Sequence, residues 1–365
     1  MELAAENLAM TELLDEIRTM IAERGPITVE QYMQLALAHP DLGYYMNRDP
    51  FGATGDFTTA PEISQMFGEL IGLWTAEVWS SMGSPSPVRL VELGPGRGTL
   101  MSDALRAARI VPAFRSALDV RLVETSPALA AMQHELLVDS GAAVSWAQTL
   151  KEVPDGPAIV IGNEFLDALP VRQFVRVNSQ WRERTVRVNG EGALVFDVAD
   201  KPEPYIRASA ANSEVLEVNP SGHRLMFELG SRIVKQGGAA LLIDYGRAEP
   251  GFGDTLQALR RHEKVDPLAC PGEADLTVHA DFPAVLAAAA AQGAETAILT
   301  QAGFLARMGL GARCEALVRA RPDRAATLGR QLNRLVSGDE MGELFKAACI
   351  HSPGWRPPAF EDRAP

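Results

Sequence analysis

One stretch, Arg89–Leu105, constrains the fold of this chain more than any other, and it reads RLVELGPGRGTLMSDAL. Its apolar start predicts a short buried strand with Glu92 near the carboxyl end, and an amphipathic helix is predicted to begin at Thr99. Between the two stand alternate glycines, Gly94, Gly96 and Gly98. A strand, a glycine turn and a helix form the arrangement in which a ligand lies against backbone N–H groups at a helix start. A tight turn that binds no ligand is the alternative.

The spacing of these glycines distinguishes between ligands. A dinucleotide fingerprint is GxGxxG, with an acidic residue about 20 positions downstream. This chain has GxGxG instead, with Glu92 just before it. The pattern resembles the E/D-x-G-x-G-x-G turn of class I S-adenosylmethionine (SAM) methyltransferases. That resemblance implies that the turn wraps the amino-acid part of SAM and that Glu92 lies beside its cationic end.

Composition narrows the class of protein and of partner. A length of 365 residues suggests about two domains, or one large domain with insertions. The net charge of −13 argues against a nucleic-acid backbone as main partner and favours a basic substrate surface. The three cysteines, Cys270, Cys314 and Cys349, are scattered, so neither a metal site nor a disulfide framework is predicted. No apolar run is long enough to span a bilayer, and the acidic N-terminal segment lacks a signal or transit pattern. We therefore expect a cytoplasmic protein without membrane insertion.

Strands and helices alternate from Val88 onward, which predicts an α/β fold with a doubly wound parallel sheet. Strands are predicted at Arg89–Glu92, Val120–Glu124, Ala143–Trp146, Ala158–Asn163, Ala239–Asp244, Glu295–Leu299 and Leu344–His351. Helices are predicted at Thr99–Ala108, Pro127–Asp139, shortly after Asn163, and at Gly222–Gln236, Asp281–Gln292 and Phe304–Arg319. Seven strands, the last antiparallel at an edge, are the number in the Rossmann-like class I methyltransferase fold.

The chain is predicted to consist of three regions, and the second of them contains this sheet. Residues 1–85 form an N-terminal helical cap with helices at Leu8–Arg24 and Val29–Ala38, followed by a glycine- and aromatic-rich lid segment and a helix from Pro61 through Glu77. A surface loop that packs its aromatic side chains on the core is the alternative to a lid. Residues 86–351 form the SAM-binding domain. It carries an antiparallel β-hairpin insertion at about 171–222, with turns at Asn178 and Asn189, and an unusually long loop at Thr255–Thr277. Residues 352–365 are a tail.

Polar residues at strand ends are the candidates for the site, because ligands of open parallel sheets bind beyond the carboxyl ends of the strands. Glu124 ends the second strand, where a carboxylate can accept two hydrogen bonds from a ribose diol; a cap on the next helix is the alternative. Trp146 and Gln148 follow at the end of the third strand, where adenine is bound in such folds; a core tryptophan is the alternative.

The fourth strand ends in GNEFLDALP, where Asn163, Glu164 and Asp167 gather polar and acidic groups. Two nearby carboxylates can bind a cation or accept a proton, and a planar guanidinium can be bound bidentately. Favourable acids at a helix N-terminus are the alternative.

Five motifs in order resemble the MidA-like family of SAM-dependent methyltransferases, whose mitochondrial members are complex I assembly factors: GDFTTAPEISQMFGELIGLW, VELGPGRGTLMSDAL, GNEFLDALPVRQF, LLIDYG and DLTVHADF. The resemblance covers about Leu13 to Ile350 and implies methylation of an arginine in a protein, a complex I-type subunit. It implies Asn163, Glu164 and Asp167 as the catalytic loop. Cofactor contacts would be Glu92, Gly94, Gly96, Gly98, Glu124, Trp146, Gln148, Thr58 and Pro61, and contacts to the acceptor would be Asp56, Phe57, Glu62, Ser64, Tyr245 and His279.

The leading hypothesis is therefore a SAM-dependent N-methyltransferase without a metal, in which Glu164 and Asp167 bind the guanidinium and help remove its proton. A non-catalytic assembly chaperone that binds a partner subunit and SAM is the second hypothesis. A nicotinamide oxidoreductase is the third, and the missing GxGxxG spacing counts against it.

Overall fold

The computed structural model describes residues 2–46 and 58–361, with side chains from Glu12 onward. The chain divides into two compact units. Unit 1 comprises Met1–Phe57, Asp167–His223 and Pro250–His279, and unit 2 comprises Thr58–Leu166, Arg224–Glu249 and Ala280–Pro365. Each unit encloses a hydrophobic core of its own. This grouping differs from the predicted partition, because the residues after Thr58 pack with the sheet while the hairpin insertion groups with the N-terminal helices.

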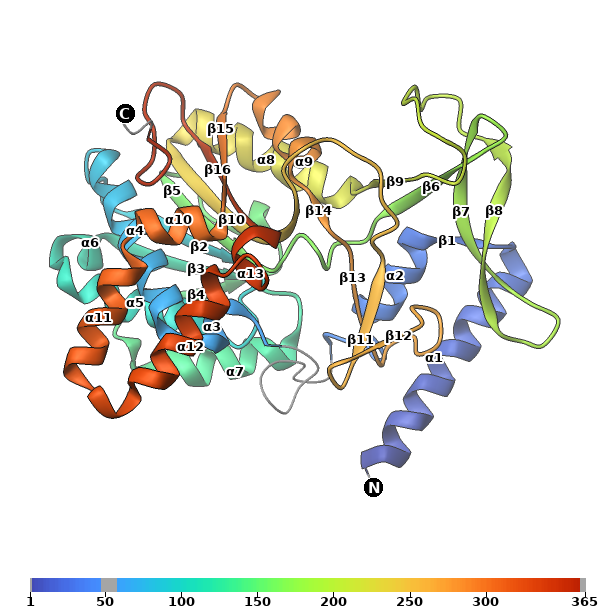
Figure 1. Ribbon diagram of the computed structural model, residues 1–365, viewed down its shortest axis with the longest axis horizontal. Coiled ribbons are helices and arrows are strands. Elements are labelled where there is room, and N and C mark those ends of the chain that lie inside the picture. Colours follow the sequence, from blue (N-terminus) through green and yellow to red (C-terminus); the bar gives the residue numbers. More distant parts are fainter. Residues whose placement is uncertain (1, 47–57, 362–365) are drawn as a thin grey trace. The chain divides into compact units, whose positions relative to one another are not determined.

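Unit 2 is built on a predominantly parallel sheet whose strands follow the order β15-β16-β10-β5-β2-β3-β4, with β14 pairing to β10 (Figure 1). These strands are β2 (Val88–Leu93), β3 (Leu118–Val123), β4 (Val144–Ala147), β5 (Ala158–Asn163), β10 (Gly238–Arg247), β14 (Ala280–Asp281), β15 (Glu295–Thr300) and β16 (Phe345–His351). The predicted α/β fold is confirmed. The last strand, β16, is antiparallel as predicted, but the prediction that it lies at an edge is wrong, because it pairs with both β10 and β15.

The register of the sheet brings the ends of four strands to one edge. Leu93 of β2 pairs with Val123 of β3 on one side and with Gly162 of β5 on the other. Asn163 of β5 in turn pairs with Ile243 of β10. The residues that follow these positions therefore lie along a common edge, which is where ligands of open parallel sheets bind.

Helices cover both faces of this sheet, with α8 and α9 together on one side and α4, α5, α10, α11 and α12 on the other (Figure 1). The helices of unit 2 are α3 (Ala60–Ile63), α4 (Gln65–Ser81), α5 (Thr99–Ala107), α6 (Pro112–Ala117), α7 (Pro127–Leu137), α8 (Pro220–Gln236, which begins in unit 1), α9 (Phe282–Ala290), α10 (Gln301–Arg307), α11 (Leu310–Ala320), α12 (Ala325–Val336) and α13 (Met341–Leu344). Short 3₁₀ turns are η1 (Ala108–Ile110), η2 (Val138–Ser140), η3 (Leu150–Glu152) and η4 (Pro322–Arg324).

Two glycines on α4 set how closely α5 approaches it. A Cβ added at Gly68 would lie 2.5 Å from the Cβ of Asp103, and one at Gly72 would lie 2.6 Å from the Cα of Ala104. Since real Cβ atoms do not come so close, only glycine permits this helix crossing. The crossing places α5, and with it the glycine turn before its first residue, against the core.

Unit 1 combines helices with two antiparallel sheets. Its elements are α1 (Glu2–Arg24), β1 (Ile27–Thr28), α2 (Val29–Ala38), β6 (Arg172–Val177), β7 (Gln180–Val188), β8 (Leu194–Pro202), β9 (Val215–Val218), β11 (Gln257–Arg260), β12 (Glu263–Val265) and β13 (Asp275–Thr277). One sheet has the order β1-β7-β6-β9 with β8 beside β7, so the antiparallel insertion is confirmed. The other sheet is β12-β11-β13. It occupies the stretch 255–277, so the prediction of a long loop there is wrong.

Three predicted helices differ from those observed. The predicted helix from Pro61 to Glu77 is divided at Ser64, whose side chain caps α4 by accepting the Met66 N–H at 3.3 Å. The predicted helix Phe304–Arg319 is divided at Gly309, which adopts a left-handed conformation with φ +86°. The short helix predicted after Asn163 is absent, and the segment is a turn. Helices α6, α12 and α13 were not predicted.

Candidate active site

The turn between β2 and α5 is left-handed at every second residue. Gly94, Gly96 and Gly98 have φ values of +60°, +54° and +85°. The N–H of Gly98 donates to the carbonyl of Pro95 at 2.8 Å, which closes the turn. A Cβ at Gly94 would lie 2.7 Å from the Phe165 ring. The predicted need for glycine is therefore met by backbone conformation at three positions and by close packing at the first.

Glu92 is a buried acid at the second-to-last position of β2. It is only 2% exposed, and its Oε2 has no hydrogen-bond partner among the described residues. Burial raises the pKa of its carboxyl well above the usual value, and the neighbouring charge of Glu124 raises that pKa further. A buried carboxyl oxygen without a donor is costly to the protein alone. A cationic ligand at this position would supply the missing partner.

Glu124 follows β3 and is held by hydrogen bonds on both oxygens. Its Oε1 accepts the N–H of Ser126 at 2.8 Å, and its Oε2 accepts Nε2 of Gln133 at 3.1 Å. Burial raises the pKa of Glu124, and these two hydrogen bonds oppose that rise. The carboxylate thus binds the N–H of Ser126, the residue whose own hydroxyl caps α7 by accepting the N–H of Leu129 at 3.3 Å, so Glu124 supports the cap of the next helix without being the cap itself. Each oxygen has further acceptor capacity, so these hydrogen bonds do not exclude a bond to a ribose hydroxyl.

Trp146 lies on β4 and is tied to the same group of residues. Its indole Nε1 donates to Oε1 of Gln133 at 2.8 Å, and its ring lies 5.5 Å from that of His134. Gln133 also donates to the carbonyl of Gly96 at 2.6 Å. Gln133 was absent from the predicted site. A signal for it exists in the sequence, because a glutamine on the buried face of α7, between Leu129 and Leu137, is unusual at a core position.

Helix α3 contacts the glycine turn and the start of α5 through Glu62. Its Oε1 accepts the hydroxyl of Thr99 at 2.5 Å, and its Oε2 lies 3.8 Å from Nη1 of Arg97. The structure thus places Glu62 beside the first residue of α5, and its predicted contact to the acceptor stays a prediction. Pro61 is buried at the start of α3.

Three further predicted site residues, Thr58, Ser64 and Gln148, have these positions in the structure. Thr58 is half-buried just before α3, and Ser64 is buried as the cap of α4. The side chain of Gln148 is exposed, and its backbone N–H donates to Glu152 at 3.0 Å. Asp56 and Phe57 lie outside the described residues.

The segment after β5 carries the predicted catalytic acid. Glu164 has a left-handed backbone with φ +49°, which is uncommon for a residue with a side chain. Its Oε1 accepts the N–H of Ala60 at 2.9 Å and Nδ2 of Asn163 at 3.0 Å. The acid is therefore oriented by α3 on one side and by the end of β5 on the other.

Asp244 explains why this segment is a turn and not a helix. Asp244 lies on β10, one residue after Ile243, which pairs with Asn163 of β5, and it is 1% exposed. Its Oδ2 accepts the N–H groups of Phe165 and Leu166 at 3.0 and 2.8 Å. Its Oδ1 accepts the N–H of Tyr245, whose ring lies 5.4 Å from that of Phe345. The carboxylate caps the strained turn from a distant part of the chain, so no local pattern could reveal it.

Asp167 and His279 belong to unit 1. Asp167 is buried, and its charge, together with that of Asp275, adds to the burial that raises the pKa of Tyr45 well above its usual value. The Tyr45 hydroxyl donates to Oδ1 of Asp275 at 2.7 Å. The backbone N–H of His279 donates to Oγ1 of Thr255 at 2.9 Å.

The edge of the sheet in unit 2 fits SAM by its chemistry. Glu92 offers a buried carboxyl oxygen for which the described residues supply no donor, the glycine turn keeps side chains away from the start of α5, and Glu124 and Trp146 line the next two strand ends. A cationic amino-acid part, a ribose and an aromatic base would meet these features in that order along the edge. Among the residues that the structure describes, no group of histidine, cysteine or acidic side chains is arranged to hold a metal ion.

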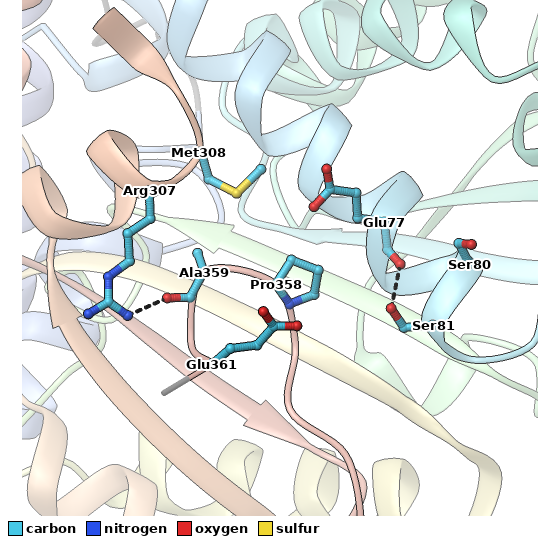
Figure 2. A pocket seen from close by; sticks show the side chains of 8 residues that line it. All are labelled: Glu77, Ser80, Ser81, Arg307, Met308, Pro358, Ala359 and Glu361. Carbon is cyan, nitrogen blue, oxygen red and sulfur yellow. Dashed lines mark hydrogen bonds between the residues drawn. The ribbon is translucent and has the colours of Figure 1, made fainter. Parts of the chain in front are cut away.

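A cavity of about 460 Å³ in unit 2 is a separate feature (Figure 2). It is lined by residues of α4, α10 and the C-terminal segment: Glu77, Ser80, Ser81, Arg307, Met308, Pro358, Ala359 and Glu361. Arg307 donates to the Ala359 carbonyl at 2.7 Å, and burial with the charge of Glu361 raises the pKa of Glu77. None of the predicted site residues lines this cavity. Within the described part of the chain, no helix is both long and apolar enough to cross a membrane.

Comparison with known proteins gives a consistent set of relatives. Residues 70–300 match the model of a family described as S-adenosyl-L-methionine-dependent methyltransferases. The zebrafish mitochondrial protein arginine methyltransferase NDUFAF7 is 36% identical over 92% of this chain and 85% of its own length. The human protein of the same name is 35% identical over 93% of this chain and 83% of its own. A crystal structure from Burkholderia thailandensis with bound S-adenosyl-homocysteine has a TM-score of 0.84 at 28% identity, covering 97% of this chain and 95% of that one.

Proposed function

This chain belongs to the family of S-adenosyl-L-methionine-dependent methyltransferases, and from that premise we propose that it methylates a nitrogen of an arginine side chain in a protein. The observation that carries the proposal is the identity of about a third, over nearly the whole chain, with relatives named protein arginine methyltransferases. The acidic strand-end segment Asn163–Glu164 supplies the matching chemistry.

The chain's own residues have separate tasks in this proposal. Glu92 binds the cationic end of the amino-acid part of SAM, and Glu124 binds the ribose. The glycine turn lets these two parts of SAM approach the backbone at the start of α5. Bound SAM supplies an electrophilic methyl group. These residues bind and orient, and most of the rate gain comes from holding the acceptor nitrogen in line with that group.

Glu164 is the proposed acceptor-side base. Its carboxylate can bind a guanidinium through charge-assisted hydrogen bonds, which localises charge on the nitrogen that will be methylated, and can then accept the proton that leaves. The N–H of Ala60 and the side-chain amide of Asn163 both donate to one oxygen, Oε1, and these two hydrogen bonds orient the carboxylate. Asp167, three positions further along, is the proposed second acid.

The finer identity of the partner is part of the same proposal. The family resemblance of the five sequence motifs supports a respiratory complex I-type subunit as the methylated protein. The cytoplasm is the proposed site of action, which the three free cysteines, Cys270, Cys314 and Cys349, support, because disulfides are rare in reducing compartments.

Labelled SAM and a protein extract from cells that lack this chain test the proposal. The wild-type protein should transfer label to a protein, and mass spectrometry should locate the methyl group on arginine. Glu164→Gln should bind S-adenosyl-homocysteine (SAH) as the wild type does and transfer no label. Label on lysine, histidine or a small molecule would contradict the arginine assignment.

Partner binding and restoration of the deletion phenotype by the same Glu164→Gln variant distinguish an assembly chaperone from an enzyme. A chaperone that uses SAM only structurally predicts that Glu164→Gln binds the partner protein and restores the deletion phenotype. An enzyme predicts that the variant binds the partner but does not restore the phenotype.

A further inference from the structure

Gln133 was not among the predicted site residues. It lies between Gly96, Glu124 and Trp146, which follow or end three neighbouring strands of the sheet. It is fully buried on α7, nine positions after Glu124. A Cβ added at Gly98 would lie 3.4 Å from its Cγ, which is an ordinary contact distance, so Gln133 packs directly against the last glycine of the turn. The side chain is therefore enclosed between two helices and two strand ends.

The amide of Gln133 makes three hydrogen bonds to three parts of the candidate site. Its Nε2 donates to the carbonyl of Gly96 at 2.6 Å and to Oε2 of Glu124 at 3.1 Å. Its Oε1 accepts the indole N–H of Trp146 at 2.8 Å. The three partners lie 37, 9 and 13 positions away along the chain, and each was predicted to contact a different part of SAM.

Only a glutamine meets all three requirements at this position. Two donors and one acceptor are the inventory of a side-chain amide. A glutamate would place a second carboxylate against Glu124 and the Gly96 carbonyl, and both of these need a donor. A methionine would fill the volume and leave the carbonyl, the carboxylate and the indole each short of a partner.

We propose that Gln133 is the positioning residue of the cofactor site. Its one side-chain amide aligns the glycine turn, the carboxylate of Glu124 and the indole of Trp146. Its removal lets these three elements shift independently, so that no single ligand meets all of them. The inference rests on the cofactor site of the proposed function and does not depend on the acceptor.

The test measures SAH affinity by calorimetry from pH 5 to 8 for the wild type, Gln133→Met and Gln133→Glu. Gln301→Met is the matched control, because Gln301 is equally buried in unit 2 and donates to a backbone carbonyl, that of Leu335, at 2.8 Å. Gln133→Met should weaken SAH binding by about 10-fold or more, the effect of one hydrogen bond to a charged group. Gln301→Met should leave the affinity unchanged.

The Gln133→Glu variant gives a readout that a loss of stability alone would not produce. The introduced carboxyl can still donate one hydrogen bond when it is protonated, whereas its ionised form repels Glu124. The ratio of the variant's dissociation constant to that of the wild type should therefore rise with pH. Glu92, Glu124 and His134 are the other ionisable side chains near this position, and both proteins carry them, so the wild-type pH series serves as the baseline for the ratio. Emission from Trp146, obtained by subtracting a Trp146→Phe version of each protein, should shift in both Gln133 variants without ligand.

Two results would overturn the inference. A ratio that does not change with pH, together with a Gln133→Met affinity equal to that of Gln301→Met, would leave Gln133 as a packing residue only. If Gln133→Met does not fold, the pH series of Gln133→Glu decides alone. No SAH binding by the wild type would overturn this inference and the proposed cofactor site together, whereas SAH binding without arginine methylation would leave this inference intact.

Discussion

Replacing Glu92 by glutamine should stabilise the protein without ligand and weaken its cofactor binding. The wild-type carboxyl is buried, lacks a donor on Oε2 among the described residues, and has a raised pKa because of burial and the charge of Glu124. A raised pKa in the folded state means that the protein is most stable with this group neutral. That stability is present at low pH and is lost as pH rises through the raised pKa. Glutamine is neutral throughout and avoids the loss.

The magnitude follows from the cost of a buried polar group without a partner. That cost is about 1–3 kcal/mol, and more for a charged group, so Glu92→Gln should gain about 1–3 kcal/mol near pH 8 and little near pH 4. Binding should change in the opposite direction. Losing a charge-assisted bond to the ligand's ammonium costs about 1.5–3 kcal/mol, or about 10- to 150-fold in affinity.

Thermal unfolding with and without SAH measures both effects in one assay. Without ligand the variant should unfold at a higher temperature than the wild type at pH 8. Ligand at about 1,000 times the wild-type dissociation constant stabilises the wild type by about 4 kcal/mol. A variant with 100-fold weaker binding gains only about 1.4 kcal/mol at the same concentration, so its advantage should be lost or reversed.

Glu217→Gln is the matched control. Glu217 is also buried with a raised pKa, but it accepts hydrogen bonds from the N–H and hydroxyl of Thr255 and from Gln173, at 3.0, 2.6 and 2.8 Å. An amide there turns an acceptor into a donor that faces donors, so this variant should lose stability and keep its SAH affinity. A Glu92→Gln protein that is less stable than the wild type at pH 8, or that binds SAH equally well, would refute the reasoning.

Four other changes test the remaining assignments. Gly96→Val should abolish SAH binding, because a branched side chain is strained at φ +54°; calorimetry with wild-type affinity would contradict the placement of the cofactor. Glu164→Gln should keep SAH affinity and lose about 100-fold or more of the methyl-transfer rate, and full activity would remove Glu164 from the catalytic set. Asp244→Ala should slow methyl transfer while SAH still binds, because two N–H groups after Glu164 lose their acceptor; an unchanged rate would count against it. Gly72→Ala should cost about 1–3 kcal/mol of stability by overpacking against α5, whereas Gly329→Ala, whose Cβ would meet open space, should gain about 0.5–1 kcal/mol. Denaturation that gives both alanines the same sign would contradict the helix crossing.

The parts of the site that lie close together in the chain could be predicted from the sequence. The run before Gly94 is apolar and short, the alternate glycines permit left-handed backbone, and an amphipathic helix follows. Each of these is a local property of neighbouring residues, so the strand, the turn and α5 appear at the predicted positions. Glu124 and Asn163 could be identified for the same reason, because each follows an apolar strand and strand ends meet at one edge.

The pairing of elements that lie far apart in the chain could not be predicted from the sequence. The position of β16 between β10 and β15 depends on which strand edges remain open once the others have paired. The stretch 255–277 forms strands only because β11 pairs on both sides.

The amino-acid sequence by itself determined the class of fold, the glycine turn and the acids at the strand ends, since these follow from hydrophobic period, backbone freedom and charge within a few residues. Only the tertiary structure decided that Asp244 would turn the chain after Glu164 and that Gln133 would join the turn, the acid and the indole. Both residues act on backbone or side chains that other elements bring to them. Their hydrogen bonds exist only when the sheet has assembled in its observed order, and that order is a property of the packed whole.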